Sequence, residues 1–126
     1  LIIDNSDRAI ALASDKTQAV IKDYTAAPVY FSEKGNGAHE WLIEFEKEPA
    51  SLRQFIAELD TALKNLNSDY EAKRHKDIAL GPPIVHAMPK GIFNKWLQSK
   101  GKMGGQHKIP RLSNERNVLE EILSFI

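Results

Sequence analysis

The sequence has no cysteine among its 126 residues, which excludes disulfide bonds and metal sites built on thiolates. It also has no surplus charge, because 17 basic and 17 acidic side chains cancel. Nucleic-acid binding generally needs excess positive charge to displace counterions, so zero net charge argues against that class. No apolar run approaches the roughly 20 residues of a membrane-spanning helix, and no signal peptide is recognisable. We therefore expect a cytoplasmic protein with no membrane and no nucleic acid as partner.

The chain does contain enough apolar material for one domain. Its length is that of a single domain, and 42% of its residues are apolar. It starts without a methionine, on the apolar triplet Leu1-Ile2-Ile3. This start predicts that residues 1–126 are one domain cut from a longer protein, and a trimmed but otherwise complete protein is the alternative.

The first part of the chain predicts a helix followed by a long strand. Residues 5–15 have apolar side chains at helical spacing, and Asp4 or Asn5 could cap the start of the helix. Residues 19–31 are rich in Val, Ile, Tyr and Thr, which favours a strand. Pro28 lies inside this strand and has no N–H to donate, so the strand should lie at a sheet edge or contain a bulge there.

A second strand is predicted over residues 39–46, after the turn signal Gly35-Asn36-Gly37. Apolar and acidic side chains alternate along it, which is typical of a half-buried strand. The face expected in the core has Trp41, Ile43 and Phe45, and the face expected in solvent has Glu40, Glu44 and Glu46. The turn predicts that the two strands pair as a hairpin.

Helices and one more strand are predicted in the rest of the chain. An apolar repeat over residues 52–66 indicates the clearest helix, with Ser51 and Gln54 at capping-box spacing, and Ser68 and Glu71 repeat that spacing for a short helix near Asp69. A strand over 84–88, a helix over 92–100 ended by Gly101, a loop over 101–111 and a final helix capped by Ser113 complete the order. This order predicts an α+β domain, with a mostly antiparallel sheet of about three strands and helices largely on one face.

Positive charge is concentrated near the end of the chain. Residues 90–116 contain seven basic side chains and one acidic side chain. One interpretation is a solvated basic face. The other is a phosphate site, because flexible glycines precede Lys108 in the loop and a proline follows it. A lysine on such a loop is a mobile point charge, although the spacing is not that of a Walker loop.

The histidines do not predict a metal site, because no pair of them has the spacing of metal ligands. His86 lies in a predicted strand, and we interpret it as a hydrogen-bonded structural residue. His107 precedes Lys108, and whether it contacts a substrate is left open. The tyrosines and tryptophans are assigned to the core or to an interface.

Four short motifs then follow one another in a specific order. They are Leu66-Asn67-Ser68-Asp69-Tyr70, Gly81-Pro82-Pro83-Ile84, Lys90-Gly91-Ile92-Phe93 and Gln106-His107-Lys108-Ile109-Pro110-Arg111. Together they resemble the C-terminal end of the auxin-responsive Gretchen Hagen family of acyl acid–amido synthetases. The hairpin with His39-Glu40-Trp41 is similar to the bacterial branch of that family.

The resemblance implies a ligase of the adenylate-forming superfamily. In that family a large N-terminal domain binds ATP, Mg and a carboxylic acid, and a small C-terminal domain swings over it. An acyl-AMP and pyrophosphate form first, and the amine of an amino acid then attacks the acyl carbon and releases AMP. Residues 1–126 would be the C-terminal lid domain, with its own N-terminal adenylation domain, a carboxylic acid and an amino acid as partners.

The resemblance also implies the site residues. Lys108 matches the lysine of the family motif and would be catalytic, offsetting charge as the carboxylate attacks the α-phosphate of ATP. Gln106 and Arg111 match flanking positions and, with Gly105, would support binding of the nucleotide. His107 replaces an aromatic residue that is common in plant members. The chain has no phosphate loop, Mg-binding motif or acyl pocket, so we expect the fragment alone to be inactive.

Two other classes of function stay open from the sequence. One is a stand-alone small-ligand-binding or regulatory module with an α+β sheet. The other is an RNA- or DNA-binding domain that uses residues 90–116, which the zero net charge disfavours.

Overall fold

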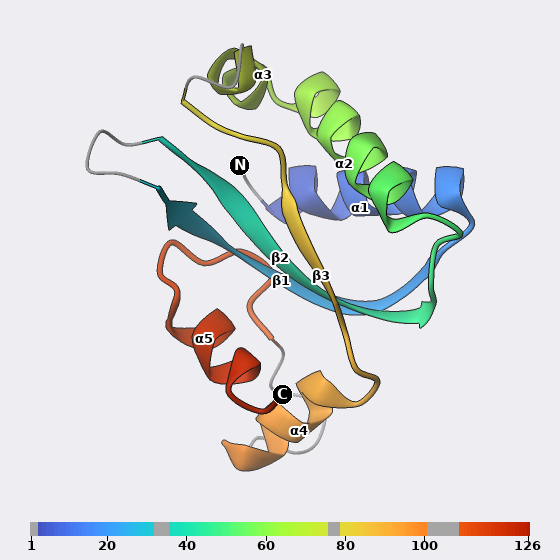
Figure 1. The fold of residues 1–126 in the computed structure, drawn as a ribbon, viewed down its shortest axis with the longest axis vertical. Helices are drawn as coiled ribbons and strands as arrows, with labels where there is room; N and C mark the ends of the chain where they lie inside the picture. Colours follow the sequence, from blue (N-terminus) through green and yellow to red (C-terminus); the bar gives the residue numbers. More distant parts are fainter. Residues whose placement is uncertain (1–2, 32–35, 76–78, 101–108) are drawn as a thin grey trace.

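The computed structural model describes residues 3–31, 36–75, 79–100 and 109–126. In this part of the chain the elements are α1 (Ile3–Thr17), β1 (Val20–Tyr30), β2 (Gly37–Lys47), α2 (Leu52–Leu66), α3 (Ser68–Arg74), β3 (Ile84–Met88), α4 (Ile92–Ser99) and α5 (Asn117–Leu123). Figure 1 shows the helices arranged around one central sheet. The predicted α+β class is confirmed, and no helix in the described ranges is long and apolar enough to cross a membrane.

The sheet has the strand order β1-β2-β3. β1 and β2 form the predicted antiparallel hairpin, whereas β3 runs parallel to β2. A parallel pair needs a long crossover, and α2 and α3 provide it. β1 is an edge strand, which confirms the edge position predicted for Pro28. The irregularities in strand pairing lie between Val20 and Asp23 and not at the proline.

Gly37 occupies a position in the hairpin where only glycine fits. A Cβ atom there would lie 2.1 Å from the carbonyl oxygen of Val29. The Gly37 N–H donates to the carbonyl of Ala79 at 3.2 Å, and its own carbonyl accepts from the Gly81 N–H at 2.8 Å. Gly37 therefore joins the start of β2 to the segment that leads into β3.

Three helices, α1, α2 and α3, pack on one face of the sheet and enclose the larger apolar cluster. The strands contribute Tyr24, Ala26, Trp41, Ile43, Phe45 and Val85, and the helices contribute Ala9, Ile10, Ala13, Phe55, Leu59, Ala62, Leu63 and Tyr70. The rings of Phe45 and Phe55 meet edge to face, with centroids 5.4 Å apart. The predicted core face of β2 is confirmed.

The two shorter helices α4 and α5 pack on the opposite face around a second cluster. It consists of Ala27, Leu42, Met88, Ile92, Phe93, Trp96, Ile109, Leu119 and Ile122. The predicted layer of helices on one face therefore corresponds to α1–α3, and the other face is covered as well. Burial on both faces explains why Leu42, between two core-facing residues, is itself fully buried.

The prediction that the glutamates of β2 face solvent is wrong for Glu40 and Glu44, although it holds for Glu46. Glu44 is only 1% exposed. Its carboxylate accepts hydrogen bonds from the backbone N–H groups of Gly91 at 3.0 Å and Phe93 at 3.4 Å. These groups lie at the start of α4, where backbone N–H groups lack partners within the helix. The buried carboxylate therefore joins α4 to the sheet.

Helix caps agree only partly with the sequence prediction. Ser51 caps α2 as predicted, and its hydroxyl accepts from the Gln54 N–H at 3.2 Å. The cap of α3 is Asn67 instead of Ser68, because the Asn67 side chain accepts from the Tyr70 N–H at 2.8 Å. The capping-box spacing therefore located this helix but not its cap.

The predicted caps of the first and last helices are wrong. α1 is already helical at Ile3, so Asp4 and Asn5 lie in its first turn. α5 begins at Asn117, well after Ser113, and its N-cap residue Arg116 makes no capping hydrogen bond with its side chain. Ser113 instead donates its backbone N–H to the carbonyl of Ala26 at 3.0 Å.

A buried polar network joins α2 to α3. Asp60 accepts from the Tyr70 hydroxyl at 2.6 Å and from two nitrogens of Arg74 at 2.8 and 2.7 Å. Arg74 also donates to the carbonyl of Leu80 at 3.1 Å, just before β3. Burial alone would raise the pKa of Asp60, but the hydrogen bonds from Arg74 and Tyr70 outweigh it and hold that pKa below its usual value.

The role of Glu44 can be tested with Glu44→Gln in the isolated chain. The amide keeps one acceptor oxygen but loses the charge, and its NH₂ group faces backbone donors. We expect the free energy of unfolding in urea to fall by about 1–3 kcal/mol. Glu46→Gln, on the same strand but exposed, is the matched control and should change it by less than about 0.5 kcal/mol. Equal effects of the two substitutions would contradict the role given to Glu44.

The Asp60 network should make stability sensitive to acid. Asp60→Asn removes the negative charge that faces the buried Arg74 guanidinium, so we expect a loss of about 3–5 kcal/mol at neutral pH. Because the pKa of Asp60 is lower in the folded protein, its contribution is complete above the unfolded-state pKa of about 3.9 and is lost as the pH falls through the folded-state pKa.

Urea unfolding at a series of pH values checks this prediction. The stabilities of the unmodified chain and of Asp60→Asn should converge as the pH falls through the lowered folded-state pKa of Asp60. Asp69→Asn on α3, whose side chain is 70% exposed, is the control and should stay within about 0.5 kcal/mol of the unmodified chain. A gap between the Asp60 variant and the unmodified chain that does not narrow in acid would show that the carboxylate charge is not responsible.

Candidate functional site

The structure describes only one of the residues predicted for the site. Lys108, Gln106 and Gly105 lie outside the described residues, as does His107. Arg111 lies within them, so the candidate site is described through Arg111 and the two segments that flank residues 101–108.

The segment that follows residues 101–108 runs beside β1. Ile109 is 4% exposed and belongs to the second apolar cluster. The carbonyl of Pro110 accepts from the Thr25 hydroxyl at 2.6 Å, and the carbonyl of Arg111 accepts from the Ala26 N–H at 2.9 Å. Leu112 forms an isolated parallel bridge with Ala26. Residues 110–113 are thus held beside the edge of β1 at Thr25 and Ala26.

The segment that precedes residues 101–108 is the end of α4, and Glu121 of α5 contacts it twice. The Glu121 carboxylate accepts from the Trp96 indole N–H at 2.9 Å and lies 2.9 Å from the Lys100 Nζ. These two hydrogen bonds, the one from Lys100 first, lower the pKa of Glu121. The two flanks therefore attach to different elements, one to α5 and the other to β1.

Arg111 lines a groove of about 400 Å³ between α1 and β1. Its guanidinium lies 3.5 Å from the Asp7 carboxylate, and its side chain is 44% exposed. Asp7 also accepts from the Tyr24 hydroxyl at 2.6 Å. Burial, and then the hydrogen bond to Asp7, raise the pKa of Tyr24 far above its usual value. Arg111 is therefore a solvent-accessible cation held loosely by an acid that has a shorter hydrogen bond to Tyr24.

Other cations of the basic stretch are paired with acids within the domain. Arg116 lies 2.9 Å from Glu40 and 3.2 Å from Glu120, and it donates to the carbonyl of Pro28 at 3.1 Å. Lys100 pairs with Glu121, as described above. Acids from β2 and α5 therefore offset part of the positive charge that the sequence concentrates in residues 90–116.

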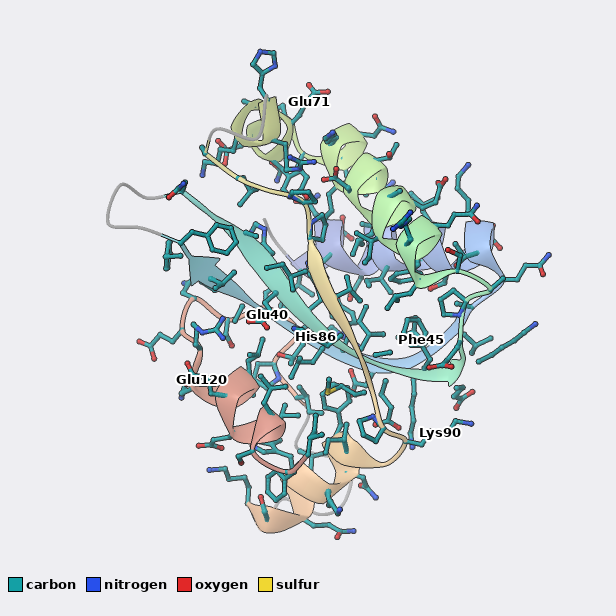
Figure 2. The ribbon with its side chains drawn as sticks, viewed as in Figure 1. Glu40, Phe45, Glu71, His86, Lys90 and Glu120 are labelled. Atoms are coloured by element: carbon teal, nitrogen blue, oxygen red, sulfur yellow. The ribbon has the colours of Figure 1, made fainter. Side chains whose placement is uncertain are left out.

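The strand position and the hydrogen bond predicted for His86 are confirmed. Its Nε2 atom lies 2.7 Å from the Glu40 carboxylate on the neighbouring strand, and Figure 2 shows the two side chains together on the sheet. Burial alone would raise the pKa of Glu40, but hydrogen bonds with His86 and Arg116 outweigh it and lower that pKa. In the described part of the chain, no group of three or more His, Asp or Glu side chains could hold a metal ion.

The described motif residues that carry the family resemblance have structural roles. Asn67 caps α3 and donates from its side chain to Asn5 of α1 at 3.0 Å. Tyr70 belongs to the buried network with Asp60. Gly91 has a φ of 87°, in the left-handed region that glycine adopts readily, and its N–H and that of Phe93 bind Glu44. These motifs therefore specify how the helices and strands are joined.

Sequence reasoning missed three residues around the candidate site: Asp7, Thr25 and Glu121. Each makes its contact with a residue more than 20 positions away in the sequence. No local spacing links such pairs, so nothing in the sequence of one chain could have pointed to them.

The fold and the flanks of the basic loop define a small α+β domain that holds a glycine- and lysine-rich segment between two anchored ends. The family model described as "GH3 family C-terminal domain" matches residues 4–117. The chain therefore belongs to the GH3 family, in which it corresponds to the C-terminal domain. The resemblance to the Gretchen Hagen family inferred from the motifs is confirmed.

Solved structures agree with this assignment at the level of the fold. The chain is similar to a GH3.15 acyl acid amido synthetase, with a TM-score of 0.73 and 18% identity, over 96% of this chain and 23% of that one. It is similar also to a structure described as AtGH3.15 acyl acid amido synthetase in complex with 2,4-DB, with a TM-score of 0.73 and 17% identity over the same shares. A search of curated proteins found no match. The chain thus spans about a quarter of the length of these synthetases.

Proposed function

We propose that residues 1–126 are the C-terminal lid domain of an ATP-dependent acyl acid–amido synthetase and supply Lys108 to its adenylation site. The observation that carries the proposal is the match of the GH3 C-terminal domain across residues 4–117. The similar synthetase chains are about four times as long, which supports a partner domain that provides the remaining parts of the site. That partner is the protein's own N-terminal adenylation domain, and the reaction takes place in the cytoplasm.

The reaction has two half-reactions. In the first, a carboxylate oxygen of the acid attacks the α-phosphorus of ATP, the bond to the β-phosphate oxygen breaks, and acyl-AMP and pyrophosphate form. In the second, the amine of an amino acid attacks the acyl carbon, the C–O bond to AMP breaks, and the amine loses a proton. Negative charge grows around the α-phosphate and on the departing pyrophosphate in the first, and on the departing AMP in the second. A cation that the lid delivers to the nucleotide during the first half-reaction therefore assists adenylation.

The residues of this chain have distinct parts in the proposal. The Lys108 ammonium offsets the charge that develops on the phosphate oxygens, since a lysine on a long flexible stem reaches a site on another domain. Gln106 and Gly105 lie beside it in the sequence and support nucleotide binding. Arg111, accessible and held 3.5 Å from Asp7, is a second cation for the phosphates. The described residues offer no set of acids for Mg, so we assign the metal to the N-terminal domain.

A stand-alone small-ligand-binding module is the alternative, and the groove of about 400 Å³ beside Arg111 is the feature that favours it. The two functions predict different behaviour of the isolated chain. A ligand-binding module binds its ligand without any further domain, whereas a lid domain contributes only part of a nucleotide site.

Lys108→Ala in the full-length synthetase tests the catalytic role. We expect pyrophosphate exchange, which reports adenylation, to slow by about 10²–10³-fold, as is typical when one charge-stabilising group is removed. Amide formation from a supplied acyl-adenylate should be nearly unchanged. Lys95→Ala on α4 is the control for loss of one lysine from the basic stretch and should leave both rates unchanged. Equal losses in the two half-reactions would rule out a specific role in adenylation.

The isolated chain provides the second test of this proposal. We expect it to fold cooperatively but to show no pyrophosphate exchange with any acid and no amide formation. Adding the separately produced N-terminal domain should restore part of the activity. Turnover by residues 1–126 alone would disprove the lid assignment, and submicromolar binding of a nucleotide or acid by the isolated chain would favour the module instead.

A further inference from the structure

We infer that Thr25 is a positioning residue for adenylation, because its hydroxyl fixes the segment from which Lys108 extends. The inference rests on the proposed function of Lys108. It concerns a residue on β1, more than 80 positions earlier in the sequence, which forms no part of the family motif.

The contact between Thr25 and Pro110 is short, and its donor is buried although Pro110 is exposed. The Thr25 hydroxyl donates to the Pro110 carbonyl at 2.6 Å, and Thr25 is only 1% exposed. If Pro110 moved away from β1, the buried Thr25 hydroxyl would lose its acceptor, which is costly, so the hydroxyl opposes that movement. The side chain of Thr25 therefore determines where the backbone of Pro110 lies relative to β1.

The neighbouring contacts do not replace this hydrogen bond. Arg111 and Ser113 pair with the backbone of Ala26, which sets the direction of the segment along β1. The side chain of Ile109 is buried in the second apolar cluster. This packing keeps Ile109 inside the domain, but apolar contacts do not fix the direction of its backbone. Among the contacts of the described residues, the hydrogen bond from Thr25 is the only one that a side chain makes to Ile109 or Pro110.

The contact at Pro110 bears on catalysis because Lys108 is only two residues before it in the chain. Lys108 is bonded to Ile109, so a shift of Ile109 and Pro110 moves the point from which the lysine side chain starts. Displacement of a catalytic group by about 1 Å can slow a reaction by about 100-fold. Loss of the Thr25 hydroxyl should therefore impair the half-reaction that uses Lys108 and spare the other.

Thr25→Val in the full-length synthetase is the test, since valine keeps the shape of threonine without the hydroxyl. We expect pyrophosphate exchange to slow by about 10- to 100-fold, with amide formation from a supplied acyl-adenylate changed by less than about twofold. Thr25→Ser retains the hydroxyl and should restore most of the exchange rate. Thr17→Val is the matched control, because it removes another buried hydroxyl, bonded at 2.7 Å to Ala13 within α1, and should leave both rates unchanged.

A double-mutant cycle with Lys108→Ala distinguishes positioning from a general structural effect. If Thr25 acts through Lys108, adding Thr25→Val to Lys108→Ala should slow exchange no further. A full additional loss in that background, or an unchanged rate in Thr25→Val alone, would overturn the inference while the role of Lys108 stands. An unchanged rate in Lys108→Ala alone would remove the proposed function itself.

A second variant keeps the test decisive if Thr25→Val does not fold. Ile109→Val removes one methylene group from the buried side chain next to Lys108 and loosens the same segment by a different contact. We expect a smaller loss, of about 3- to 10-fold, again confined to pyrophosphate exchange. Equal losses in both half-reactions would contradict positioning by this segment.

Discussion

The C-terminal half of this domain depends on two carboxylates that β2 places under a layer of helices. Glu44 accepts the backbone N–H groups at the start of α4, and Glu40 pairs with Arg116 just before α5. A buried carboxylate is costly unless donors surround it. His86 of β3 and Lys22 of β1 lie beside Glu40 and Glu44, and the remaining donors come from Arg116 and from the start of α4. The same bonds that pay the desolvation cost therefore determine where α4 and α5 lie on the sheet.

The alternation along β2 explains why sequence reasoning identified the strand but misplaced these glutamates. A period of two shows that one face of a strand is apolar and the other polar. It does not show whether water or a second layer of the protein meets the polar face. Trp41, Ile43 and Phe45 were therefore predicted correctly, whereas the surroundings of Glu40 and Glu44 depend on residues 47 to 76 positions later in the chain. The helices themselves were predictable because their apolar spacing is local, and Asn67 and Arg116 show that the capping residues were less so.

The family could be recognised from short motifs, whereas part of the site depends on contacts between distant residues. The motif residues Asn67, Tyr70 and Gly91 serve to join elements of the fold, and their order in the chain sufficed to indicate the family. A fold shared with synthetases at 17–18% identity shows how few positions need to be retained for that purpose. Thr25 and Glu121, by contrast, lie outside these motifs and make contacts with residues far away in the sequence. They could be found only once the fold had brought them together.

The two flanks of residues 101–108 are held by independent contacts, and this independence bears on the proposed chemistry. Glu121 holds the end of α4, whereas Thr25 and Ala26 hold residues 110–113 along β1. A group that starts from fixed supports loses less conformational freedom when it binds than one on a free chain. Arg116 and Lys100 are meanwhile paired with acids of the domain. These two cations therefore help to hold the elements of the domain together, whereas under the proposed function Lys108 is the cation delivered to a nucleotide bound by another domain.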